Sequence, residues 1–182
     1  TNMSTLFHGA RKLDSAGQAD DFWMLVEGDT ITETGSGRTP DQSQATERVD
    51  VGGSWIVPGF IDLHGHGGGG HSYDDSAEEI LAAVATHRSH GTTRSILSLV
   101  ANPIAQLRAS LAVIADLAEA DPTILGSHLE GPFLAEDKRG AHNPAYLKAP
   151  LPFEVEELIG AAHGTLRQLT IAPELPGALE AI

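Results

Sequence analysis

The 182-residue chain contains no cysteine, and this absence excludes two kinds of chemistry. Without thiols the protein can form no disulfide framework, and no cysteine nucleophile can take part in catalysis. A chain without disulfides fits a reducing compartment, and the first residues show no basic segment followed by an apolar core. We therefore expect the protein in the cytoplasm.

Basic residues are also scarce. Eleven Lys and Arg stand against 25 Asp and Glu, which gives a formal net charge of −14. This charge argues against nucleic acid or an anionic membrane as a partner, and no apolar run approaches the length that spans a bilayer. A small anionic substrate stays possible, because a metal ion or a few local donors can dominate a single site.

The chain changes character after about residue 55. Residues 1–55 read as short strands with turns, and a hairpin is expected at 22–34 around Gly28. From residue 56 to 182 strands alternate with helices, which implies parallel strands joined by helical crossovers. We expect strands at 55–61, 92–100, 124–130 and 169–172. A (β/α)₈ barrel needs eight strands, so the predicted fold is α/β, with about four βα units that form the first half of a TIM-like barrel.

Two histidines follow the first of these strands. Side chains alternate across a strand, so His64 and His66 should project from one face, with Asp62 beside them. Two neighbouring imidazoles at the end of a buried strand can hold a metal ion. Taken alone, such a pair more often consists of ordinary strand histidines than of metal ligands.

A second group of polar residues lies at the end of the strand at 124–130. Glu130 is at its carboxyl end, where parallel α/β folds place working residues, and His128 should face the same way. A carboxylate there could complete a site begun by the histidine pair, although a strand-end glutamate is often only solvated or salt-bridged.

The loop at 138–144 offers hydrogen-bond donors and a glycine that lets the backbone approach a ligand. His142 in this loop is a candidate substrate contact or else a surface histidine. The chain has no Gly-x-Ser-x-Gly elbow, and no Gly-Lys-Ser/Thr follows the glycine run at 67–70, so serine hydrolases of that type and P-loop proteins are excluded.

Together these pieces resemble a known family. The run Pro58-Gly59-Phe60-Ile61-Asp62-Leu63-His64-Gly65-His66 and the later Gly91-Thr92-Thr93 are similar to the amidohydrolase superfamily of metal-dependent hydrolases. Three further segments resemble, within it, the family of N-acetylglucosamine-6-phosphate deacetylases: His128-Leu129-Glu130-Gly131-Pro132-Phe133, Gly140-Ala141-His142-Asn143-Pro144 and Leu169-Thr170-Ile171-Ala172-Pro173-Glu174.

The resemblance implies roles for five residues. Glu130 matches the metal-ligating glutamate, and His64 and His66 match a histidine pair found in members with a second metal position. Ala141 and His142 match positions that contact the amino sugar. The implied cofactor is a divalent metal, zinc first, with iron, cobalt or manganese as alternatives. The implied fold adds a small β-sandwich built from both chain ends, to which residues 1–55 would contribute.

The resemblance also implies an activity: a cytoplasmic homodimer that removes the acetyl group from N-acetylglucosamine 6-phosphate. The family's catalytic aspartate and two further metal-ligating histidines would lie beyond Ile182, so we expect residues 56–182 to be a truncated half-barrel, inactive alone and associated with the missing half or with another copy. Two alternatives stay open. The protein could act on a different amide, or be a non-catalytic metal-binding or oligomerising fragment.

Overall fold

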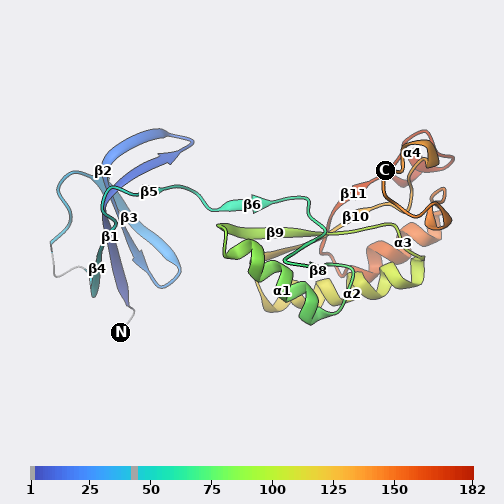
Figure 1. Cartoon of the computed structure of the whole chain (residues 1–182), viewed down its shortest axis with the longest axis horizontal. Helices are drawn as coiled ribbons and strands as arrows, with labels where there is room; N and C mark the ends of the chain where they lie inside the picture. Colours follow the sequence, from blue (N-terminus) through green and yellow to red (C-terminus); the bar gives the residue numbers. More distant parts are fainter. Residues whose placement is uncertain (1–2, 42–44) are drawn as a thin grey trace. The chain divides into compact units, whose positions relative to one another are not determined.

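A computed structural model describes residues 3–41 and 45–182, and the chain divides into two compact units, with the boundary between Pro58 and Gly59 (Figure 1). The boundary expected from the sequence lay three residues earlier, between 55 and 56.

The first unit is a single five-stranded sheet. Its strands are β1 (Ser4–Asp14), β2 (Gly17–Glu27), β3 (Thr30–Ser36), β4 (Glu47–Asp50) and β5 (Trp55–Ile56). The order is β3-β2-β1-β4, with β5 also paired to β1. The expected hairpin is confirmed as β2–β3, and Gly28 supplies the positive φ of 62° that its turn requires. Because the described residues form one sheet, a second sandwich layer is not confirmed.

The second unit carries four parallel strands in the order β11-β10-β9-β6. They are β6 (Phe60–Asp62), β9 (Thr92–Leu99), β10 (Ile124–Glu130) and β11 (Leu166–Thr170). Three helices lie along one side of the sheet: α1 (Ala77–Arg88), α2 (Ile104–Ala120) and α3 (Pro152–Ala161) (Figure 1). This arrangement confirms an α/β unit with a parallel half-barrel sheet. Short elements complete it: β7 (Gly67–Gly68), β8 (His71–Ser72), α4 (Ala178–Ala181) and 3₁₀ turns at Glu136–Lys138 and Pro144–Tyr146.

The helices form where the sequence provides caps and apolar stripes. Ser76 caps α1 by accepting the N–H of Glu79, as its Ser-x-x-Glu spacing predicts. The Glu79 carboxylate does not complete the reciprocal bond; it pairs with His71 on β8 instead. On α2, Leu107 and Leu111 are fully buried at i, i+4 and belong to the core between the helices and the sheet.

Two strand expectations are wrong in their bounds. The strand expected at 169–172 is β11, which begins earlier and ends at Thr170. The run at 55–61 is two strands: β5 pairs with β1 in the first unit, whereas β6 pairs with β9 in the second. Pro58 separates them and has no N–H to continue a ladder. The strand before the histidines is also not buried, because Phe60 is 64% exposed and Ile61 57% exposed on an edge of the described sheet. No helix among the described residues has the length and apolar character needed to cross a membrane.

Candidate metal centre

His64 and His66 lie on a turn that follows β6 and not within the strand, which ends at Asp62. Strand alternation therefore does not explain why their rings converge. The turn is held by hydrogen bonds: Asp62 Oδ1 accepts the N–H of His64 at 3.2 Å, and Gly65 exchanges two bonds with Ser98 on β9. In these, the Gly65 N–H donates to Ser98 Oγ at 3.2 Å, and the Ser98 N–H donates to the Gly65 carbonyl at 3.0 Å.

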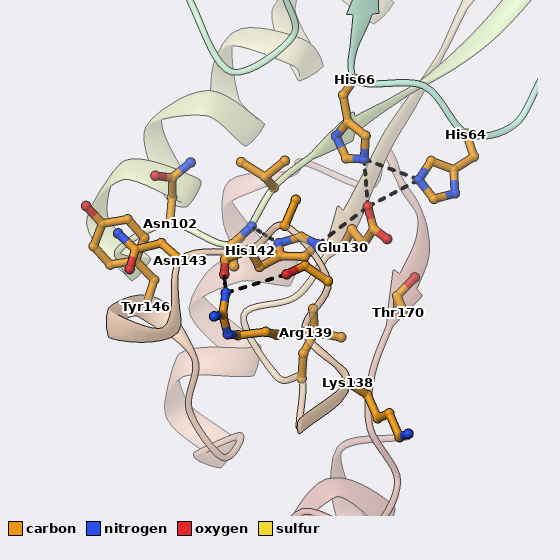
Figure 2. Close-up of a pocket in the computed structure, with 15 residues that line it drawn as sticks. His64, His66, Asn102, Glu130, Lys138, Arg139, His142, Asn143, Tyr146 and Thr170 are labelled. Carbon is orange, nitrogen blue, oxygen red and sulfur yellow. Dashed lines mark hydrogen bonds and ion pairs between the residues drawn. The ribbon is translucent and has the colours of Figure 1, made fainter. Parts of the chain in front are cut away.

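Both rings point at one oxygen of Glu130, at the carboxyl end of β10 (Figure 2). Oε2 of Glu130 lies 2.6 Å from Nε2 of His66 and 3.2 Å from Nε2 of His64. The two Nε2 atoms are 3.2 Å apart, close to the roughly 3.3 Å that two nitrogens would show around a tetrahedral zinc with bonds of about 2.0–2.1 Å. The donor set fits a divalent metal, and the three residues form a group that could hold one. The 2.6 Å between His66 and Glu130 is a direct hydrogen bond.

The charge of Glu130 suits the same role. Burial raises the pKa of this carboxyl, but the hydrogen bond from His66 and the charges of His66, His64 and His142 outweigh it, so the pKa lies below its usual range. Glu130 is therefore ionised at neutral pH and available as an anionic ligand.

His142 approaches the same carboxylate from the loop after β10, with Nε2 3.7 Å from Oε2 of Glu130. Its Nδ1 accepts the backbone N–H of Ala101 at 3.1 Å, so the neutral ring carries its proton on Nε2. Arg139 donates to the His142 carbonyl at 2.7 Å and holds the loop in place. His142 thus presents a hydrogen-bond donor, and not a metal-binding lone pair, to the space above Glu130.

Asp74 fixes the segment that orients His142. Its carboxylate accepts the N–H of Val100 at 3.2 Å and the side-chain amide of Asn102 at 3.3 Å. Burial raises the pKa of Asp74 to about 6, although the Val100 bond, the charge of His66 and the Asn102 bond oppose that rise. Asp74 thereby positions Ala101 between these two residues, and sequence patterns alone did not single it out.

A cavity of about 680 Å³ opens over these residues (Figure 2). All five residues selected from the sequence line it, and so do three polar residues that were missed, Asn102, Tyr146 and Thr170. Asn102 and Thr170 follow or end parallel strands, so the rule that strand ends build the site could have found them. The full lining is His64, His66, Val100, Ala101, Asn102, Glu130, Leu134, Lys138, Arg139, Gly140, Ala141, His142, Asn143, Tyr146 and Thr170.

His128, which was expected to face the site beside Glu130, does not line the cavity. Its side chain is completely buried, and its ring packs edge-on against His64 with 4.9 Å between ring centroids. Burial, with the charges of His64 and His66, lowers the pKa of His128 to about 4 even though Glu130 favours protonation. The ring is therefore neutral at pH 7.

Comparison with known proteins gives consistent names. A curated N-acetylgalactosamine-6-phosphate deacetylase from Escherichia coli O157:H7 is 31% identical over 99% of this chain and 47% of its own length. The N-acetylglucosamine-6-phosphate deacetylase of Homo sapiens is 34% identical over 90% of this chain and 41% of its own. No family model matches the chain. The chain spans about half the length of the curated relatives it matches.

Solved structures agree. A variant N-acetyl-D-glucosamine-6-phosphate deacetylase from Mycobacterium smegmatis, in complex with N-acetyl-D-glucosamine 6-phosphate, has a TM-score of 0.90 and 35% identity, covering 98% of this chain and 46% of that one. The deacetylase from Thermotoga maritima, at 22% identity and a TM-score of 0.78 over 96% and 44% of the two chains, supports the fold alone. Relatives and structures thus point to one kind of enzyme, and the coverage is consistent with its N-terminal part.

Proposed function

Since this chain matches the N-acetylglucosamine-6-phosphate deacetylases over almost its whole length, we propose that the complete protein hydrolyses N-acetylglucosamine 6-phosphate to glucosamine 6-phosphate and acetate. The observation that carries the proposal is the convergence of His64, His66 and Glu130 in the lining of one cavity, with the donor of His142 beside them. An amide carbonyl placed there would meet a Lewis acid site and a hydrogen-bond donor together.

The proposed cofactor is a divalent metal held by His64, His66 and Glu130, with zinc first and iron, cobalt or manganese as alternatives. When bound, such an ion polarises an amide carbonyl and lowers the pKa of a water molecule. The chain's own part is to supply one anionic and two neutral ligands. The Asp62 and Ser98 bonds hold the turn that carries the two histidines.

The proposed substrate contacts are His142 and Ala141. Nε2–H of His142 donates toward the cavity and can bind an oxygen of the acetamide or the sugar. Ala141 lines the same cavity, and a small side chain there leaves room for a ring. The phosphate contacts belong to parts of the complete protein outside these residues or to the loop that contains Lys138 and Arg139.

A second candidate substrate is N-acetylgalactosamine 6-phosphate, which differs from the first in the orientation of one ring hydroxyl. It is favoured by the relative from Escherichia coli O157:H7, whose similarity extends over 99% of this chain. Both sugars carry the same acetamide, so the choice between them depends on contacts to the hydroxyl in which they differ.

The test uses the complete protein loaded with zinc and measures acetate released from four substrates: the two amino-sugar phosphates, unphosphorylated N-acetylglucosamine, and an unrelated cyclic amide. We expect kcat/KM to be highest for one of the two phosphates. Turnover of the cyclic amide alone would favour the different-amide alternative. Release from none of them, with metal bound, would favour a non-catalytic metal-binding fragment.

Homodimer formation and a cytoplasmic location are part of the same proposal, as the family resemblance implies. Sedimentation of the complete protein tests the first, because a monomer at micromolar concentration contradicts it.

A further inference from the structure

His128 joins three neighbouring strands through its ring. Nδ1 lies 2.9 Å from Oγ of Ser98 on β9, and Nε2 lies 2.8 Å from Oγ1 of Thr170 on β11. His128 itself is on β10 and is completely buried. A buried imidazole with both nitrogens bonded is costly to disturb, because its removal would leave the buried Ser98 hydroxyl without an acceptor and take from Thr170 the bond to Nε2.

Ser98 extends this chain of bonds to the metal-binding turn. Its Oγ accepts the N–H of Gly65 at 3.2 Å, and Gly65 is the residue between His64 and His66. Moving Ser98 therefore moves the peptide that sets the spacing of the two imidazoles. The His128 ring also packs directly against His64, so the same buried side chain supports the turn at two points.

The bonds have a definite direction. Ser98 is fully buried, and its hydroxyl hydrogen has one acceptor among the described residues, Nδ1 of His128. Nδ1 is therefore the acceptor, Nε2 carries the proton, and that N–H donates to Oγ1 of Thr170. A doubly protonated ring would instead leave the Ser98 hydrogen without an acceptor.

Thr170 is the last residue in this series of hydrogen bonds, and it lines the cavity. Because its oxygen accepts from His128, its own hydrogen is free to donate outward. Resting on the proposed function, we infer that His128 is a positioning residue. Through Ser98 it holds the turn between the two metal-binding histidines, and through Thr170 it presents a hydroxyl donor to an acceptor oxygen of the ligand in the cavity.

The first arm of the test measures zinc affinity of the complete protein by competition with a chelator, with no substrate present. Ser98→Ala and His128→Phe should each weaken zinc binding by about ten- to hundredfold, as loss of groups that orient metal ligands usually does. Ser127→Ala is the matched control: Ser127 is the neighbouring residue on β10, is equally buried, and its hydroxyl has no partner among the described residues. We expect its affinity to stay within twofold of wild type.

The second arm tests Thr170. Thr170→Val should leave zinc affinity unchanged and raise KM for the amino-sugar phosphate by about tenfold with a smaller effect on kcat, and Thr170→Ser should restore KM. If His128→Phe does not fold, Ser98→Ala, which removes one oxygen, decides the first arm. Wild-type zinc affinity in Ser98→Ala, or an unchanged KM in Thr170→Val, overturns the inference even if the protein is a deacetylase. Weakened zinc binding in an enzyme that releases no acetate would instead leave the turn argument standing and refute only the proposed function.

Discussion

Nε2 of His66 lies 2.6 Å from Oε2 of Glu130, although 64 residues separate the two in the sequence. The contact arises because β6 and β10 run parallel on either side of β9, so the residues that follow them meet at one end of the sheet. Both residues then face the same cavity. The substitutions that test this site are made in the complete protein.

Glu130→Gln should reduce bound zinc by at least tenfold. The substitution keeps the shape of the side chain but removes the negative charge that the two imidazoles face. Metal content after dialysis, measured by elemental analysis, provides the check. Glu136→Gln, in the 3₁₀ turn outside the cavity lining, is the control and should retain its metal. Equal metal content in both variants would remove Glu130 from the site.

His142→Asn should lower kcat/KM for the preferred amino-sugar phosphate by about ten- to hundredfold while metal content stays the same. Asparagine can still accept the Ala101 N–H, but it lacks the Nε2–H that faces the cavity. Steady-state kinetics and metal analysis on the same preparation separate the two effects. Loss of metal in this variant would show that His142 is a ligand and not a substrate contact.

Stability should fall between about pH 6.5 and pH 4 because of His128. Burial lowers the pKa of this ring to about 4 from the model-peptide value of about 6.5, so in that window the unfolded chain binds a proton that the folded chain does not. Its contribution is fully present above pH 6.5 and is lost as the pH falls toward 4. One full proton corresponds to a slope of at most about 1.4 kcal/mol per pH unit.

Thermal melts of metal-free protein across this range check the slope. His128→Asn should melt at a lower temperature at pH 7 but with a shallower pH dependence than wild type. His163→Asn is the control, since His163 is exposed and has a positive φ of 47° that asparagine tolerates. Parallel curves for wild type and His128→Asn would contradict the prediction.

Two glycines should respond in opposite ways to alanine. At Gly126, φ is 132° and an added Cβ would approach the Thr165 carbonyl oxygen to 2.0 Å, so Gly126→Ala should destabilise the protein by more than 1 kcal/mol. Gly160 lies in α3 with open space around it, so Gly160→Ala should stabilise by up to about 1 kcal/mol. Urea denaturation measures both. Stabilisation by Gly126→Ala would mean that this strand does not approach Thr165 as described.

The parts of the fold with strong local signals were predictable. The strand at 124–130 was predicted at its observed bounds, because an apolar run ends there at Gly131 and Pro132. The strand before His64 was predicted too long, because apolar residues of two different strands adjoin across Pro58. The approach of His64 and His66 to Glu130 was predictable, because residues at the carboxyl ends of parallel strands gather at one end of the sheet. The direction of the His142 ring was not, because it depends on the N–H of Ala101, a backbone group without a sequence signature.

The most direct test of the central claim is acetate release from the preferred amino-sugar phosphate before and after metal removal. The complete protein, stripped with a chelator and then reconstituted with zinc, should lose its activity and recover it, whereas Glu130→Gln should not recover under the same zinc concentration. Full activity in the stripped wild-type protein, with residual metal well below one ion per active site, would contradict a metal centre at His64, His66 and Glu130.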